Sequence, residues 1–566
     1  MASDLLETRR EQMFPKLTPA QIERLTARGH RIAFRAGEIL VEPGERARRV
    51  LVVVAGSLEV LMRGAQGHDL FIMLSPGHFS GEMNVLRGSV AFARIRAHED
   101  GAAIEISAER LREIVQTDAE LSELVMRAFI LRRMALISAG NLDVMLLGSH
   151  HSGDTLRLRE FLTRNGYPYV NVDVETDPDV QALFERFGVR YEDLPVVICR
   201  GERTFKNPSN REVAECLGMN PVTDACRRHD LLIVGAGPAG LAAAVYGASE
   251  GLDVRIVETM APGGQAGTSS KIENYLGFPT GISGQALAGR ALSQAQKFGA
   301  SLEVAASAET LDCTGRPFRV RLTDGTSATA SLVLIATGAQ YRVLDLDKCS
   351  RFLGAGVYYA ATHVEAKLCQ AEEIVIVGGG NSAGQAAVYL AGFSRHVHLL
   401  VRSGGLADSM SRYLIRRIEE SPSITLHTYT QLTALDGSDR LERVCWRRMP
   451  DGAPEWHQIP HVFLMTGALP NTQWLQGCVA LDSRGFVKTG PELSPDDLAS
   501  SRWPLARAPY LLESSIPGVF AAGDVRSGSV KRIAAAVGEG SMCVQFVHRA
   551  LRELSVPSQQ QAPGCT

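Results

Sequence analysis

The stretch LLIVGAGPAGLAAAVYGASEGLDVRIVE, residues Leu231 to Glu258, decides how the larger part of this chain is expected to fold. An apolar run leads into three glycines, Gly235, Gly237 and Gly240, and a second apolar run ends on Glu258. This order predicts a strand, a tight turn, a helix and a parallel strand, which is typical of a dinucleotide-binding fold. Gly235 makes the turn, Gly237 lets a pyrophosphate approach the backbone, and Gly240 lets the helix pack on the strand.

The helix after this turn is expected to begin at Pro238 and Ala239. Its free N–H groups and the positive end of its dipole favour the phosphates of a dinucleotide. Glu258, at the end of the second strand, is placed to accept hydrogen bonds from a ribose. The sequence therefore predicts one complete dinucleotide site in this region.

A second copy of the pattern is EEIVIVGGGNSAGQAAVYLAGFSRHVHLLVRS, residues 372–403. The three glycine positions are taken by Gly378, Gly380 and Ala383. The helix is expected to start at Asn381 and Ser382. Two such folds in one chain, one for a tightly held flavin and one for a nicotinamide, predict hydride transfer between them.

The second strand of this copy ends on Arg402 instead of an acid. An acid there favours the free 2′-hydroxyl of NADH, whereas an arginine suits the 2′-phosphate of NADPH. We therefore predict NADPH, with Arg402 as the principal phosphate ligand and Arg412 as its assistant. Use of NADH, with both arginines as ordinary solvated side chains, is the alternative.

Composition restricts the partners that can be expected. Lys and Arg number 59 against 62 Asp and Glu, a formal net charge of -3, so no basic field predicts binding to nucleic acid. The N-terminal stretch is charged, and no run of about 18 apolar residues predicts a membrane span. The ten cysteines form no CxxC pair, which suits a reducing cytoplasm and argues against a disulfide framework or a metal site.

From about Met13 to Ile137, short alternating apolar runs broken by Gly and Pro predict a small β-roll, followed by helical spacing. This layout resembles the cyclic-nucleotide-binding domain family, whose phosphate cassette matches Ser80, Gly81, Glu82 and Met83. The arginine of that cassette falls on Ala91, and a phosphate without a fixed cation loses its charge-assisted hydrogen bonds.

Arg94 and Arg96 follow, but successive side chains of a strand point to opposite faces, so at most one would face the pocket. A true cyclic-nucleotide site and a degenerate docking or regulatory roll both stay open. Glu82 is either a ribose ligand or a solvated surface side chain.

Residues from about Leu142 to Met219 predict the order β-α-β-α-β-β-α and resemble a thioredoxin or glutaredoxin fold. The CxxC of that family is replaced, with its spacing kept, by Ser149, His150, His151 and Ser152, so dithiol exchange is closed there. Pro195 stands where the family has its cis-proline. The module is either an adaptor that keeps a recognition shape or a structural spacer.

Four further segments follow the first glycine loop: GGQAGTSSKIENYLGFP at 263–279, LVLIATGA at 332–339, TGALPNT at 466–472 and IPGVFAAGDV at 516–525. With the two glycine loops they closely resemble low-molecular-weight thioredoxin reductases over roughly residues 228–555. The resemblance implies FAD and NADPH as cofactors, a homodimer, and a nicotinamide domain that rotates against the FAD domain.

The resemblance also assigns the modules and the flavin side. The expected fold is a multidomain α/β protein: a β-roll (1–140), a thioredoxin-like α/β sandwich (141–222), and two Rossmann-type domains, one for FAD (228–343 and 476–555) and one for NAD(P)H (344–475), before a flexible tail (556–566). Residues implied to lie along FAD, besides those of the first loop, are Gly264, Gln265, Asn274, Thr337, Gly338, Gly523, Asp524, Lys531, Arg532 and Ile533. The last three replace the usual Arg-Gln-Ala of the family, so different side chains are expected around the flavin.

The resemblance ends where thioredoxin reductases carry Cys-Ala-Thr-Cys, because this chain has Ala360, Ala361, Thr362 and His363. Both sulfurs are absent, so the dithiol route of the family is closed. His363 would lie beside the flavin, where an imidazole can donate or accept the proton that accompanies hydride transfer. The alternative is that His363 only fills the space of the lost cysteine.

Three functions remain open from the sequence. The first is an NADPH-dependent flavoenzyme that passes electrons to a small molecule, a quinone, ferredoxin or flavodoxin, or oxygen. The second is thioredoxin-disulfide reduction by an unrecognised thiol route, for which Cys369 and Cys565 are the candidate thiols. The third is a non-enzymatic redox or nucleotide sensor. In all three, the N-terminal modules regulate or recognise and do not carry the chemistry.

Overall fold

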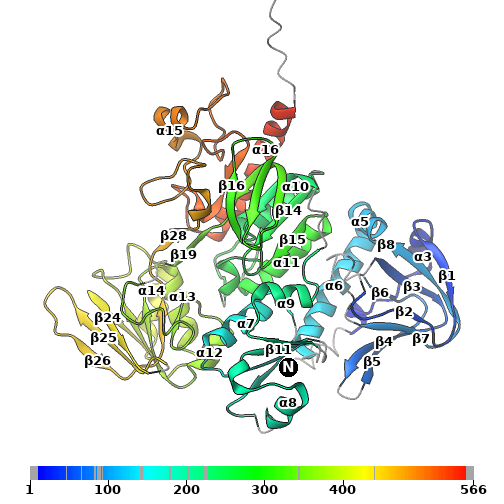
Figure 1. Cartoon of the computed structure of the whole chain (residues 1–566), viewed down its shortest axis with the longest axis horizontal. Coiled ribbons are helices and arrows are strands. Elements are labelled where there is room, and N and C mark those ends of the chain that lie inside the picture. The colour runs from blue at the N-terminus through cyan, green and yellow to red at the C-terminus, as the bar shows by residue number, and fades with distance from the viewer. Residues whose placement is uncertain are drawn as a thin grey trace, which may run out of the picture.

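The computed structural model describes residues 10–555, apart from short gaps (Figure 1). The gaps are 46–47, 65–66, 82–84, 86–90, 92, 140–143, 168, 178–179, 200–202, 222–226, 270, 342–343 and 439. Glu82, Met83, Cys565 and the predicted tail therefore lie outside the described residues. Within them, no helix is both long and apolar enough to cross a membrane.

The N-terminal part is a β-roll of two four-stranded sheets, with strand orders β1-β8-β3-β6 and β2-β7-β4-β5. Its strands are β1 (His30–Phe34), β2 (Ile39–Val41), β3 (Arg49–Ala55), β4 (Leu58–Gly64), β5 (Gly67–Leu74), β6 (Phe79–Ser80), β7 (Arg94–Ala97) and β8 (Gly101–Ser107). Helices α2 (Arg10–Met13) and α3 (Pro19–Thr26) precede the roll, and α5 (Ala108–Thr117) and α6 (Ala119–Ala139) follow it. Apolar residues of β3, β8, α5 and α6 share one core, so these two helices are part of the roll.

The next module has a four-stranded sheet in the order β10-β9-β11-β12, with β10 parallel and β11 antiparallel to β9. Its elements are β9 (Val144–Gly148), α7 (Gly153–Arg164), β10 (Val170–Asp173), α8 (Val180–Phe187), β11 (Val196–Cys199), β12 (Arg203–Lys206) and α9 (Asn210–Cys216). This is the element order expected from the sequence, and the peptide bond between Leu194 and Pro195 is cis.

The first glycine loop lies in a seven-stranded sheet of order β15-β14-β13-β18-β17-β16, with β29 paired to β18. The strands are β13 (Arg228–Val234), β14 (Val254–Glu258), β15 (Ser301–Val304), β16 (Ala308–Asp312), β17 (Phe318–Leu322), β18 (Ser327–Ile335) and β29 (Val519–Ala521). Helices α10 (Pro238–Ser249), α11 (Gly284–Lys297) and α16 (Ile533–Ser555) pack with it. The small residues of α10 allow it to lie close to α16.

The second loop lies in a separate parallel sheet of order β20-β27-β21-β22-β23. Its elements are β20 (Val357–Tyr358), α12 (His363–Leu368), β21 (Glu373–Val377), α13 (Asn381–Leu390), β22 (His396–Leu400), α14 (Arg412–Glu420), β23 (Ile424–His427) and β27 (Val462–Leu464). A three-stranded sheet of β24 (Thr430–Asp436), β25 (Arg443–Arg448) and β26 (Glu455–His457) adjoins it. The paired strands β19 (Ala339–Tyr341) and β28 (Ala468–Pro470) connect the two dinucleotide folds.

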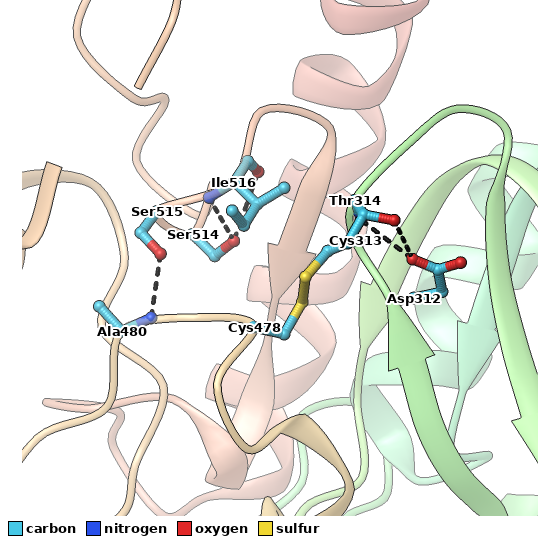
Figure 2. Close-up of a disulfide and its surroundings, with 8 residues drawn as sticks. All are labelled: Asp312, Cys313, Thr314, Cys478, Ala480, Ser514, Ser515 and Ile516. Carbon is cyan, nitrogen blue, oxygen red and sulfur yellow. Dashed lines mark hydrogen bonds between the residues drawn. A yellow bond between two sulfur atoms is a disulfide. The ribbon is translucent and has the colours of Figure 1, made fainter. Parts of the chain in front are cut away.

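One disulfide bond joins Cys313 to Cys478, although the cysteine spacing argued against disulfides (Figure 2). Cys313 directly follows β16, and Cys478 follows the return from the second dinucleotide fold. The sequence separation is 165 residues, so no local motif reveals the pair. The bridge encloses the whole second fold in one covalent loop, which ties its exit point to the first fold.

Candidate functional site

The glycines of the first loop have different surroundings, as their predicted roles require. A Cβ at Gly235, whose φ is +107°, would lie 2.3 Å from the carbonyl oxygen of Ala336, and one at Gly240 would lie 2.0 Å from that of Gly235. A Cβ at Gly237 would meet nothing within 4 Å. Packing therefore demands two of the glycines, while the third borders open space at the start of α10, where free N–H groups suit a pyrophosphate.

Glu258 is held beside this loop by its own neighbours. Its carboxylate accepts hydrogen bonds from the backbone N–H of Ala236 at 2.7 Å and of Met260 at 2.9 Å. The acid predicted to bind a ribose thus lies at the mouth of the loop, with its orientation fixed.

Residues far apart in the sequence meet the first loop. A Cβ at Gly264 would lie 3.1 Å from Cα of Gly237, and one at Gly523 would lie 3.0 Å from Cβ of Ala239. Gln265 donates from Nε2 to the carbonyl oxygen of Ala339. The structure therefore brings the GGQ segment (residues 263–265) and the GDV segment (Gly523–Val525) against the first glycine loop.

Asp524 and Lys531 form the other part of this region. Burial raises the pKa of the Asp524 carboxyl and lowers the pKa of the Lys531 amine. Lys531 Nζ donates to the carbonyl oxygen of Asp524 and, at 2.7 Å, to Oγ of Ser529. Arg532 is exposed, Ile533 begins α16, and Asn274 is exposed on the 271–280 segment.

Thr337 and Gly338 belong to the connection between the two folds. Thr337 Oγ1 donates to the carbonyl oxygen of Asn471 at 2.8 Å, and Asn471 Nδ2 donates back to the carbonyl oxygen of Thr337 at 2.9 Å. The N–H of Asn471 donates to the carbonyl oxygen of Gly338 at 3.1 Å. The outgoing and returning chains are thus bonded to each other directly beside β19 and β28.

The second loop repeats the geometry of the first. A Cβ at Gly378, with φ of +147°, would lie 2.4 Å from the carbonyl oxygen of Met465, whereas the nearest atom to a Cβ at Gly380 is 4.0 Å away. Asn381 begins α13 and accepts a hydrogen bond from the N–H of Ser411 at 2.7 Å. Ser382 follows it in the first turn, and Ala383 is fully buried at the third position.

Arg402 lies just after β22, and Arg412 is the first residue of α14. Both side chains are exposed. Neither guanidinium group makes a hydrogen bond or ion pair with another residue in the described part of the chain. Unpaired guanidinium groups at the end of the second strand suit an anionic ligand such as a 2′-phosphate.

The AATH segment, residues 360–363, runs from β20 into α12. Ala361 is buried, and Thr362 donates to the Glu365 carboxylate from its N–H at 2.7 Å and from Oγ1. His363 is the first residue of α12, and its side chain lies outside what the structure describes. Cys369 is fully buried, which raises the pKa of its thiol to about 12. A buried thiol that stays protonated is a poor nucleophile.

The thioredoxin-like module packs against this same segment. Leu156 of α7 shares a hydrophobic core with Tyr358 and Ala361. At the start of α7, a Cβ at Gly153 would lie 2.9 Å from the carbonyl oxygen of Leu353. The helix that follows the SHHS turn (residues 149–152) therefore packs on the AATH segment, where the resemblance to thioredoxin reductases implies a pair of cysteines.

Two carboxyl groups meet at this contact. Burial, the nearby charge of Glu365 and a hydrogen bond to it raise the pKa of Glu160, on α7, to about 8. Oε1 of Glu365 is buried and has no donor among the described residues. A protonated Glu160 can supply that donor.

The module also contacts the first dinucleotide fold. Arg164 Nη2 donates to the carbonyl oxygen of Gly264 at 2.9 Å, and Asn165 Nδ2 donates to that of Met260 at 3.0 Å. Both acceptors adjoin the first glycine loop. One module thus bridges both dinucleotide folds next to the predicted site. The two folds are also joined directly, by an ion pair at 2.7 Å between Arg417 of α14 and Glu273.

In the β-roll, the candidate phosphate ligands are already engaged. Arg94 pairs with Glu42 at 2.9 Å and Arg96 with Glu59 at 2.6 Å. Ala91 is buried, so it offers no cation at the cassette position. Neither arginine is a free cation for a cyclic phosphate in this arrangement.

Comparisons with known proteins agree with this architecture. A family described as pyridine nucleotide-disulphide oxidoreductase matches residues 229–540, and a cyclic nucleotide-binding domain matches residues 31–118. The first match covers more than half of the chain, so the chain belongs to the pyridine nucleotide-disulphide oxidoreductase family. It is an FAD-dependent NAD(P)H oxidoreductase with FAD and NADPH as its cofactors, and the two glycine loops fit these two dinucleotides.

Similar proteins within that family include thioredoxin reductases and alkyl hydroperoxide reductase subunits. NADPH-dependent thioredoxin reductase 3 of Arabidopsis thaliana is 32% identical over 57% of this chain, and the match spans only 58% of that protein. The thioredoxin reductase of Treponema pallidum is 31% identical over 56% of this chain and 94% of its own length. The Lactococcus lactis thioredoxin reductase structure (FR conformation) superposes with a TM-score of 0.51 at 25% identity, covering 58% of this chain and all of that one.

Sequence reasoning missed the contact between α7 and the AATH segment. Leu156 and Glu160 lie in an ordinary amphipathic helix, and nothing in the sequence marks the partner of that helix. The Cys313–Cys478 bridge was missed for the same reason, since only the fold brings the two residues together.

Proposed function

We propose that this chain passes electrons from NADPH through FAD directly to an acceptor that is not a dithiol. The observation that carries the proposal is the loss of sulfur at both dithiol positions, Ala360 and His363 in the reductase and Ser149 and Ser152 in the thioredoxin-like module. The burial of Cys369 supports it, because the nearest thiol in the sequence cannot replace the missing pair. The acceptor classes are a small molecule such as a quinone, ferredoxin or flavodoxin, or oxygen.

Different residues of the chain bind the two cofactors and transfer the proton. The open backbone at Gly237 and Gly380 admits the two pyrophosphates, Glu258 binds the ribose of FAD, and Arg402 with Arg412 binds the 2′-phosphate of NADPH. Bound FAD supplies a group that accepts the hydride of NADPH and releases its electrons to the acceptor. His363, at the start of α12, donates or accepts the accompanying proton.

The proposal is tested by mixing the NADPH-reduced protein, without oxygen, with a panel of acceptors in a stopped-flow spectrometer. We expect rapid return of the oxidised flavin spectrum with a quinone or ferredoxin, and none with oxidised thioredoxin. Rapid return with oxidised thioredoxin, abolished by prior alkylation of the protein's thiols, would contradict the proposal. Full reduction with no productive acceptor would favour the sensor function.

The Arg402→Ala, Arg412→Ala double variant is expected to raise KM for NADPH roughly 10- to 100-fold, because charge-assisted hydrogen bonds contribute about 1.5–3 kcal/mol. KM for NADH should stay within about twofold of the wild type, since NADH has no 2′-phosphate. Steady-state kinetics with both nucleotides measures the difference. Arg416→Ala, an exposed arginine on the same helix, is the matched control. Equal changes for both nucleotides would contradict the assignment.

We further propose that the thioredoxin-like module regulates the enzyme by holding the two dinucleotide folds together. Its hydrogen bonds to the Gly264 and Met260 carbonyls and its core contact with Tyr358 and Ala361 support this role. The family resemblance implies that the nicotinamide domain rotates against the FAD domain. A module bonded to both domains restricts that rotation, and it also covers the face that an external thioredoxin would approach.

Docking of this module is expected to weaken as pH rises. The Glu160 carboxyl has a pKa of about 8 when docked, above its ordinary value near 4.5, so the docked state holds a proton that the free state releases. The contribution of this proton to the free energy of docking is complete below about pH 4.5. It is lost as pH rises through 8, by at most about 1.4 kcal/mol per pH unit. Hydrogen exchange of α7 from pH 6.5 to 9, corrected for intrinsic rates, measures it.

Glu160→Gln keeps the shape and a donor but cannot ionise, so it should remove the pH dependence. Glu185→Gln, on α8 of the same module, is the control and should keep it. If the wild type and Glu160→Gln respond identically to pH, the carboxyl pair does not govern docking.

A further inference from the structure

The SHHS turn of the thioredoxin-like module gathers a group of metal-binding side chains. His150, His151 and Glu175 each offer one ligand atom, and these atoms all lie within 4.8 Å of one another. They come from two places in the module: the turn between β9 and α7, and the segment just after β10. In the described part of the chain, no other three His, Cys, Asp or Glu side chains meet this condition.

We propose that this turn binds a divalent transition metal of the Zn²⁺ type through His150, His151 and Glu175. Two imidazoles and one carboxylate are a donor set that zinc uses with a fourth position left for water. The spacing of the cysteines alone predicts no metal site. The fold adds Glu175, which is distant in sequence and close in space.

The distances show that the group is nearly assembled. Oε2 of Glu175 lies 3.7 Å from Nε2 of His151, and the His150 ring comes within 3.9 Å of the same oxygen at Nδ1. The two imidazole rings lie 3.7 Å apart between centroids. Ligand atoms around a tetrahedral metal with bonds of about 2.0–2.2 Å are themselves roughly 3.3–3.6 Å apart.

Neighbouring groups hold the ligands in place. Nδ1 of His150 donates to Oδ2 of Asp173 at 2.7 Å, which leaves Nε2 of the same ring as the metal ligand, and carboxylates behind metal-binding histidines commonly orient the ring in this way. Ser149 Oγ donates to the Glu175 carboxylate and accepts the N–H of His151 at 3.1 Å. Ser152 is occupied as the N-cap of α7, where it accepts the N–H of Thr155. The two serines that replace the cysteines thus shape the turn, and the two histidines between them offer the nitrogen ligands.

A second group of histidines provides the contrast. His398 Nδ1 and His427 Nε2, on β22 and β23, lie 3.1 Å apart and satisfy each other by a hydrogen bond. Two rings bonded in this way need no ion. This pair therefore serves as an internal control for histidine-dependent binding elsewhere in the chain.

The test uses the full-length holoprotein, with any tag removed and metal stripped by a chelator. Titration with Zn²⁺ by calorimetry, and with Co²⁺ by its visible absorption, is expected to show one equivalent per chain with a Kd of about 10 μM or tighter. His151→Ala and Glu175→Gln should each weaken this equivalent at least tenfold, and Asp173→Asn should weaken it roughly 10- to 100-fold. His427→Ala should leave it unchanged.

Circular dichroism and the flavin spectrum verify that each variant is folded. Binding weaker than about 1 mM in the wild type would overturn the proposal, as would an equivalent that survives His151→Ala or Glu175→Gln. Loss of that equivalent in His427→Ala would assign it to the other histidine pair and overturn the proposal equally. Because flavin reduction by NADPH is read separately, failure of the metal site leaves the proposed electron route intact.

Discussion

A Gly237→Val variant is expected to purify as a folded protein that has lost its flavin. A Cβ at this position meets nothing within 4 Å, so the protein itself tolerates the side chain. The same open space is where the pyrophosphate of FAD is predicted to approach the backbone, and two added methyl groups would fill it. We expect at least a 100-fold loss of FAD affinity, because the phosphates lose their approach to the helix N-terminus.

Absorbance near 450 nm relative to 280 nm measures the bound flavin, and circular dichroism measures the fold. Gly289→Val is the matched control, because Gly289 lies on α11 of the same domain and a Cβ there also meets nothing within 4 Å. A Gly237→Val protein with full flavin content would contradict the assignment of this loop to FAD.

Replacing Leu156 with Ala is expected to release the thioredoxin-like module. Leu156 is 7% exposed and joins the core formed by Tyr358 and Ala361. Truncation of a buried leucine costs about 2–5 kcal/mol, which shifts the docking equilibrium by roughly 30-fold to several thousand-fold. If the module restrains domain rotation, release should raise turnover with small acceptors several-fold, and protection of α7 from hydrogen exchange should fall.

Leu183→Ala is the control for this variant. Leu183 packs in the module's own core on α8, away from the contact with α12. It should lower the stability of the module without faster turnover. If Leu156→Ala changes neither turnover nor exchange of α7, the module does not restrain the enzyme.

The sequence predicts the dinucleotide folds well because their demands are local. Gly235 and Gly378 need positive φ, Gly240 needs to lack a side chain, and each requirement stands within a few residues of the strand and helix that impose it. The thioredoxin-like order β-α-β-α-β-β-α was predictable for the same reason, since each element has its own apolar pattern.

Contacts between modules were not predictable, because they depend on surfaces that carry no separate pattern. Glu160 is an unremarkable acid in α7 until the fold sets it against Glu365, and Glu175 joins the SHHS turn only through the pairing of β10 with β9. The β-roll shows the same limit, because the sequence leaves open whether Arg94 or Arg96 could face a phosphate. Arg94 and Arg96 are bound to glutamates that are distant in sequence.

If no redox-active dithiol stands between flavin and acceptor, an anaerobic titration of the holoprotein with dithionite should end at about two electrons per FAD. We expect this value in the wild type and equally in a Cys313→Ser, Cys478→Ser variant. Uptake of about four electrons per FAD in the wild type, falling to two in that variant, would contradict the claim and make the Cys313–Cys478 bridge an electron relay.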